Sequence, residues 1–95
     1  MEIAVETIGD ALAKLLSQLG LEKEVQRSQL LVDWPEVVGE QIAKVTEAER
    51  IEDRILFIKV KHSVWRNELY FRKADLIKKL NKHAGQNLVK DIRFY

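Results

Sequence analysis

The spacing of apolar residues in this chain changes from a helical to an extended period near its middle. Between Thr7 and Leu19, apolar side chains recur every three or four residues, which is typical of one face of an α-helix. From Ala48 the period becomes two, as in half-buried strands, and after Ser63 the helical spacing returns. This order predicts an α+β fold in which helices come first and a β-β-α-β unit follows.

The N-terminal part is predicted to contain three helices. Thr7 is the expected N-cap of the first helix, and Gly20 is its expected C-terminal stop. Residues 33–35 are expected to mark a break or kink in the second helix, because proline disfavours helical geometry in the residue before it. A third, short helix then runs from about Pro35 to Lys44.

The rest of the chain is predicted to form a three-stranded sheet on one long helix. Residues 52–54 form a tight turn between the first two strands, and a helix capped by Ser63 runs over about residues 64–84. The last strand covers residues 88–94, and the N-terminal helices complete the layer and cover Phe71. The predicted core residues are Leu56, Ile58, Val60, Trp65, Leu69, Leu76, Leu80, Ile92 and Phe94.

Length and composition bound the domain and its location. With 95 residues we expect one domain covering residues 1–95, with little room for a deep catalytic cleft. The apolar runs are too short to span a bilayer, and the acidic N-terminus lacks the basic segment of a signal peptide. We therefore expect a cytoplasmic protein that does not enter a membrane.

Catalytic and metal-binding motifs are not evident in the sequence. The chain has no cysteine, and its two histidines, His62 and His83, have no second ligand at metal-binding spacing. The four glycines do not match the spacing of a phosphate-binding loop, and the serines fall in predicted helices or caps. We therefore expect no enzyme activity, no cofactor, no metal and no small-molecule substrate.

Charge is distributed unevenly along the chain, although its net charge is only +1. Residues 1–53 carry a balance of −7, and residues 54–95 carry +8. Such asymmetry favours an acidic side that meets a protein and a basic side that meets phosphate. The alternative is that the two halves attract each other within the fold.

One candidate nucleic-acid surface is the outward face of the sheet. The residues that alternate with the core set are Phe57, Lys59 and Lys61 in one strand and Arg93 and Tyr95 in another. Bases stack on aromatic rings while Lys and Arg neutralise phosphates, so this pattern suits single-stranded nucleic acid. The alternative is that a helix or a second subunit covers Phe57, since exposed sheet edges and apolar patches also lead to homodimers.

A second candidate surface lies on the long helix. Lys78, Lys79 and Lys82 lie away from the apolar stripe, either as contacts for phosphate or as an ordinary solvated face. Trp34 is either a core anchor or a contact for a protein partner.

A series of loose motifs in a fixed order extends from about residue 8 to the end of the chain. Its residues are Trp34, Val38, Gly39, Ile42, Ala43, Ile51, Asp53, Leu56, Phe57, Ile58, Lys59, Val60, Ser63, Val64, Trp65, Glu68, Leu69, Leu76, Ile77, Leu80, Asn81, Gly85, Val89, Ile92, Arg93 and Phe94. In their order and spacing these residues resemble the DciA family, bacterial loaders of the replicative helicase.

The resemblance implies a domain related to the K-homology fold that binds DNA, especially single-stranded or junction DNA, and contacts the hexameric replicative helicase. RNA is the alternative ligand. Glu36 and Glu40, near Trp34 in the acidic half, are the expected helicase-facing residues. Two departures from related proteins matter. Arg54 stands where the family commonly has glycine, so the turn geometry is expected to differ, and no GxxG loop is present to grip nucleotides as in ordinary K-homology domains.

Overall fold

The computed structural model describes residues 3–95, with side chains from residue 7 onward. Its helices are α1 (Ile3–Leu19), α2 (Glu22–Val38), α3 (Glu40–Ala43), α4 (Ser63–Phe71) and α5 (Lys73–Ala84). Its strands are β1 (Thr46–Glu52), β2 (Ile55–Val60) and β3 (Asp91–Phe94). Helices come first and a β-β-α-β arrangement follows, with its helix in two segments, so the predicted α+β class is confirmed. None of the described helices combines the length and apolar character that a bilayer crossing requires.

The strands form one mixed sheet in the order β1-β2-β3. β1 and β2 are antiparallel and are joined by a tight turn, as predicted, although the turn consists of Asp53 and Arg54 alone and Glu52 is the last residue of β1. β3 returns parallel to β2, with Leu56 opposite Ile92 and Phe57 opposite Arg93. β3 is therefore an edge strand, with one side free of strand pairing.

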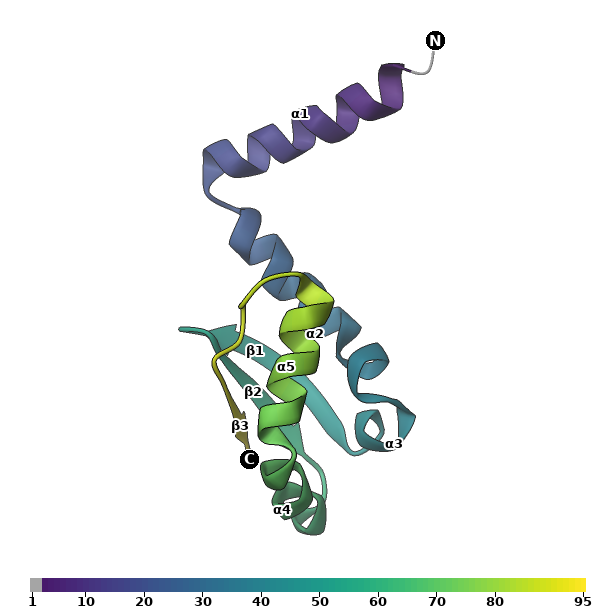
Figure 1. The fold of residues 1–95 in the computed structure, drawn as a ribbon, viewed down its shortest axis with the longest axis vertical. Helices are drawn as coiled ribbons and strands as arrows, with labels where there is room; N and C mark the ends of the chain where they lie inside the picture. The colour runs from purple at the N-terminus through teal and green to yellow at the C-terminus, as the bar shows by residue number, and fades with distance from the viewer. Residues whose placement is uncertain (1–2) are drawn as a thin grey trace.

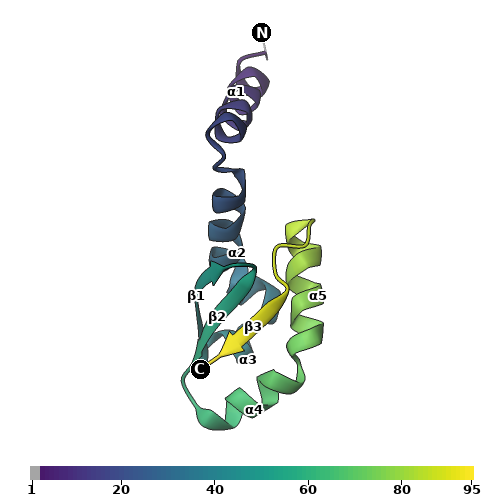
Figure 2. The same cartoon turned by 90° about the vertical axis from the view of Figure 1, so that its left-hand side faces the viewer.

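The core lies between one face of the sheet and the helices α2 and α5 (Figures 1 and 2). Seven of the nine predicted core residues are buried, and Trp65 and Phe94 lie partly buried at its margin. The core also contains residues outside this predicted set, among them Trp34, for which a role as a core anchor was one of the two expectations. These residues are Leu30, Trp34, Ile42, Leu88 and Val89. Truncation of buried apolar residues such as these typically costs about 2 to 5 kcal/mol.

The predicted break before Pro35 is wrong. α2 continues through Pro35 and ends at Gly39, whose φ of 88° lies in the region that favours glycine. Leu30 and Trp34, one turn apart on α2, are both buried, so a continuous helix keeps them on the same packed face. Tertiary packing therefore outweighs the local preference of proline. The third helix, predicted from about Pro35 to Lys44, is shortened to α3 (Glu40–Ala43).

The single long helix predicted over residues 64–84 is also wrong, because Arg72 separates α4 from α5. A helix of 21 residues would be about 32 Å long, whereas a six-residue strand spans about 20 Å. The bend allows Leu69 of α4 and Leu76 of α5 to reach the same core.

The predicted helix caps were wrong at both positions. Thr7 lies inside α1, which begins at Ile3. Ser63 is the first residue of α4, and His62 occupies the N-cap position without a side-chain hydrogen bond. The positive φ of Gly20 and of the C-cap Gly85 agrees with the helix stops expected there.

The strand boundaries also differ from the prediction. β1 begins at Thr46, before Ala48, and β3 begins only at Asp91. Val89 is nevertheless buried, because the Asn81 side-chain amide takes the place of a pairing strand. Asn81 Nδ2 donates to Val89 O (2.8 Å), and Val89 N donates to Asn81 Oδ1 (2.9 Å).

Helix α1 does not help to complete the layer, contrary to expectation. It contacts only α2 among the described elements and extends away from the sheet, which gives the molecule a length of 55 Å (Figure 1). Phe71 is likewise not covered by the N-terminal helices, since its side chain is 84% exposed.

Candidate nucleic-acid interface

The open face of the sheet carries the predicted aromatic and basic residues, but a neighbouring strand changes their surroundings. Phe57 lies opposite Arg50 of β1, and the Arg50 guanidinium carbon stacks 4.0 Å from the centre of the Phe57 ring. Lys59 lies opposite Glu47. Arg50 also pairs with Glu52 at 3.1 Å. This face is therefore mixed in charge, and the Phe57 ring is half-buried under a cation of its own chain.

The predicted cations fall on two separate faces. Lys59, Arg93 and Tyr95 are exposed on or beside the open face of the sheet, and Lys61 follows the end of β2. Lys78, Lys79 and Lys82 of α5 lie beyond the opposite face, because α5 covers the core side of the sheet (Figure 2). They are exposed, and Lys79 pairs with Asp75 at 3.4 Å. The structure does not bring the two sets together.

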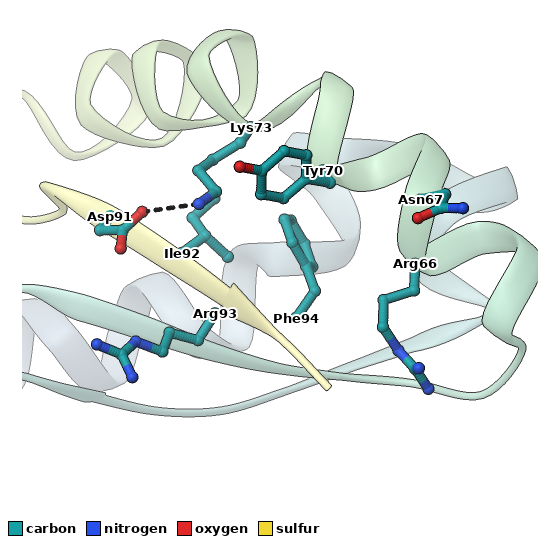
Figure 3. A pocket seen from close by; sticks show the side chains of 8 residues that line it. All are labelled: Arg66, Asn67, Tyr70, Lys73, Asp91, Ile92, Arg93 and Phe94. Carbon is teal, nitrogen blue, oxygen red and sulfur yellow. Dashed lines mark ion pairs between the residues drawn. The ribbon is translucent and has the colours of Figure 1, made fainter.

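A groove of about 340 Å³ lies between α4, the start of α5 and the edge strand β3. Its lining residues are Arg66, Asn67, Tyr70, Lys73, Asp91, Ile92, Arg93 and Phe94. Figure 3 shows the rings of Tyr70 and Phe94 and the ammonium of Lys73 near its centre, with Arg66 on α4 and Arg93 on β3 toward either side. Aromatic rings and cations, which the sequence suggested for the sheet face, thus meet here.

The cations of this groove differ in how they are paired. Lys73 Nζ lies 3.1 Å from Asp91 Oδ1 and 4.8 Å from the centre of the Tyr70 ring. Among the side chains described, Arg66 and Arg93 form no ion pair. Two guanidinium groups are therefore available to a phosphate, while Lys73 is held against the aromatic wall.

Asp91 is the acidic residue of the groove. Burial by itself raises the pKa of Asp91, but the hydrogen bond from Lys73 and that from the backbone of Ile92 outweigh it. The net result is a lowered pKa, so Asp91 is ionised at neutral pH. Its charge offsets that of Lys73 and fixes the position of the ammonium.

Sequence reasoning missed Arg66, Asn67, Tyr70 and Lys73 as site residues. Arg66, Tyr70 and Lys73 are spaced four and three residues apart, which places two cations and a ring along one side of a helix. The spacing of these three residues could therefore have indicated a site on this helix. The sequence could not indicate that β3 lies beside them, because that depends on tertiary structure.

Trp34 is a core residue in this structure, with 2% of its surface exposed. Its Nε1 donates to Thr46 Oγ1 at 2.9 Å, and Thr46 Oγ1 donates to Ile42 O at 2.8 Å. The indole therefore ties α2 to β1 and α3. Glu36 and Glu40 remain exposed near the end of α2.

A polar cluster joins α2 to α5. His83 Nε2 lies 3.0 Å from Asp33 Oδ2 and 4.0 Å from Glu36 Oε2, and Gln29 Nε2 donates to Asp33 Oδ1 at 2.9 Å. The hydrogen bonds from His83 and Gln29 lower the pKa of Asp33. The three potential metal ligands lie within 4.8 Å of one another, although His83 is 50 residues from Asp33 in sequence. The hydrogen bonds of Asp33 account for this arrangement.

Fold and groove together define a small α+β domain whose sheet edge carries an aromatic and basic groove. Residues 7–94 match the family model described as "Dna[CI] antecedent, DciA". The match covers most of the chain, which therefore belongs to the DciA family.

Similar proteins come from several bacteria. A UPF0232 protein of Corynebacterium glutamicum is 27% identical over 90 residues, which cover 95% of this chain and 51% of that protein. A UPF0232 protein of Streptomyces coelicolor is 27% identical over 88 residues, covering 90% and 46%. One of Rhodococcus jostii is 30% identical over 84 residues, covering 88% and 43%. This chain thus spans about half the length of these relatives.

Proposed function

We propose that residues 1–95 act as one non-enzymatic domain that binds single-stranded DNA in the groove between α4 and β3. The observation that carries this proposal is that the exposed ring of Tyr70 lines one groove at the sheet edge together with Arg66 and Arg93, which form no ion pair with any described side chain. Aromatic side chains stack with bases of any sequence, and arginine neutralises phosphate, so binding should tolerate many sequences.

The path of the strand continues from the groove onto the open face of the sheet. Arg93 is shared by both surfaces, and Tyr95 and Lys59 lie one step further along β3 and β2. Tyr95 stays attached to β2 by backbone bonds to Ile58 and Val60. Lys61 then extends the basic path beyond the strand. Phe57 is a weaker stacking site in this proposal, because Arg50 covers its ring.

The test compares two charge-matched double variants in anisotropy titrations with a labelled oligothymidylate. Arg66→Ala/Arg93→Ala should weaken binding strongly. Lys78→Ala/Lys82→Ala removes the same charge from the far side of the molecule and should change affinity little. Tyr70→Ala should cost about 1 to 3 kcal/mol if one base stacks on the ring. Equal losses in the two double variants would contradict the groove and favour diffuse attraction to basic charge.

RNA remains the alternative ligand, because stacking and phosphate contacts do not distinguish the two sugars. The 2′-hydroxyl is the group by which a protein separates RNA from DNA. Competition between strands of matched sequence tests this choice directly. Stronger competition by the RNA strand would move the proposal to an RNA-binding module.

We further propose that this domain assists the loading of the replicative helicase in the cytoplasm. Membership of the DciA family supports a role in replication. The exposed carboxylates of Glu36 and Glu40 form the proposed helicase-facing surface, and Trp34 is left out of it because it is buried.

The helicase proposal is tested by pull-down from nuclease-treated lysate. The natural protein should retain the helicase, and Glu36→Lys/Glu40→Lys should lose it. Asp53→Lys/Glu52→Lys makes the same charge change at the β1–β2 turn and serves as the control. Failure of the natural protein to retain helicase excludes the loading role, whereas equal retention by all three proteins excludes only the acidic surface.

A further inference from the structure

Helix α1 presents an apolar stripe that nothing in the described chain covers. Ile8, Leu12, Leu15 and Leu19 are spaced four, three and four residues apart, and each is about half or more exposed. These are the intervals of a coiled-coil seam. Asp10 and Lys14 are the charged residues of residues 7–19, and they lie on the other side of the helix. The stripe therefore has no flanking charge to oppose contact with an apolar surface.

The chain also carries a second apolar strip, on α2. Leu21, Val25 and Val32 are exposed, and they form the apolar part of a shallow groove of about 320 Å³. Its polar lining residues are Glu24, Ser28 and Gln29. The groove runs along about three turns from Leu21 to Val32, and its three apolar side chains are exposed. One molecule thus presents both an apolar helix and an apolar groove of similar length.

The connection between the helices keeps α1 away from this groove. Gly20 N donates to Ser17 O at 3.1 Å, and Leu21 N donates to Leu16 O at 2.9 Å. Together with the φ of 70° at Gly20, these bonds form the Schellman motif that ends many helices. Val25 N already donates to Leu21 O, so the first bond of α2 follows immediately. Folding α1 back onto its own α2 would break this bonded junction.

We propose that α1 of one molecule packs into the α2 groove of a second copy, and that the two copies exchange these contacts reciprocally. A twofold pair then contains the same contact twice, as closed dimers do. Burying both strips in both copies would remove on the order of 1,200 Å² of surface, the lower end of the range for specific stable interfaces. The inference is independent of the proposed DNA site, since no groove residue of α4 or β3 takes part.

The first experiment measures the mass of the intact chain by sedimentation velocity at increasing concentration. The natural protein should approach the mass of a dimer in the micromolar range. Leu12→Asp/Leu15→Asp, which places two charges in the stripe, should remain monomeric at every concentration. Ala13→Asp/Lys14→Asp adds two aspartates to the side of α1 away from the stripe and should still dimerise. A natural protein that remains monomeric at 100 µM, taken as about 100-fold above a 1 µM dissociation constant, overturns the proposal.

The second experiment identifies the contact, using the absence of cysteine from the chain. Leu15→Cys and Val25→Cys proteins are mixed and treated with a short bismaleimide. The expected product is a dimer that contains one chain of each variant. Cross-linking within the chain of a Leu15→Cys/Val25→Cys double variant would show that α1 folds back and would overturn the proposal. Dimers formed by the Leu15→Cys protein alone, without mixed dimers, would overturn it in favour of pairing between two α1 helices.

Discussion

At the scale of single residues, the hairpin turn shows a conformation that its sequence does not favour. Asp53 and Arg54 have φ values of 51° and 64°, so both lie in the left-handed region. A two-residue turn of this kind prefers Asp-Gly, because glycine adopts positive φ without steric cost. Arg54 therefore adopts a conformation that favours glycine, and its carbonyl accepts a hydrogen bond from Lys90 N at 2.8 Å.

Replacing Arg54 with glycine should therefore stabilise the protein. A left-handed conformation costs a residue with a side chain about 1 to 2 kcal/mol, and the entropy of glycine offsets about 0.5 to 1 kcal/mol of that gain. We expect Arg54→Gly to raise the free energy of unfolding by about 0.5 to 1 kcal/mol, measured as a higher denaturant midpoint. Asp53→Gly should gain less, because aspartate tolerates positive φ better. A lower midpoint for Arg54→Gly would contradict the argument.

At the scale of elements, local patterns predicted those features that local forces decide. The alternation of Leu56, Ile58 and Val60 located β2, because a strand with one buried face must alternate. The stripe that includes Leu76 and Leu80 located the buried face of α5 for the same kind of reason. The turn was predicted as well, since its residues must reverse the chain between two paired strands.

Other features depend on contacts between distant residues and could not be predicted locally. Pro35 remains inside α2 because burial of Leu30 and Trp34 favours one continuous helix. The bend at Arg72 follows from the length of the sheet, not from a helix-breaking residue. The groove of the candidate site needs β3 beside α4, so its cations and rings came together only in three dimensions.

The contact between α2 and α5 should make stability depend on acid. The pKa of Asp33 is held below its ordinary value of 3.8, chiefly by the hydrogen bond from His83. The contribution of Asp33 to stability is therefore present above pH 3.8 and is lost as pH falls through the lower, folded-state pKa. Asp33→Asn should unfold at a lower denaturant concentration at neutral pH, and its midpoint should decline less than that of the natural protein between pH 5 and pH 2.

A second variant separates this effect from a general response to acid. His83→Gln leaves the carboxylate of Asp33 in place and removes its principal partner, so its acid dependence should also be flatter. Both variants should retain the acid dependence that comes from Asp91, whose pKa is lowered as well. If the denaturant midpoints of both variants fall with pH in parallel with that of the natural protein, the cluster is excluded as a source of the pH dependence.

At the scale of the whole molecule, ion pairs among the described side chains do not remove the charge imbalance between the two halves. The acidic residues Glu68, Asp75 and Asp91 of the basic half each pair with a cation of that same half. Among the described side chains, short contacts between titratable groups of the two halves involve only His83 with Asp33 and Glu36. The remaining cations of residues 54–95 form no ion pair with any side chain that the structure describes. They are Arg54, Lys59, Lys61, Arg66, Lys78, Lys82, Lys90 and Arg93.

Four of these unpaired cations lie along the proposed DNA path, which allows the salt dependence of binding to be predicted. If Arg66, Arg93, Lys59 and Lys61 each neutralise one phosphate, the logarithm of the binding constant should fall with the logarithm of salt concentration with a slope of about 3. Removing one cation of the path, as in Lys59→Gln, should reduce that slope by about 0.7. Lys78→Gln should leave it unchanged, because α5 covers the opposite side of the sheet. Titrations of a labelled single strand over a range of salt concentrations give all three slopes. A slope close to zero would mean that phosphate contacts do not drive binding, and a reduced slope for Lys78→Gln would place the strand on the helix.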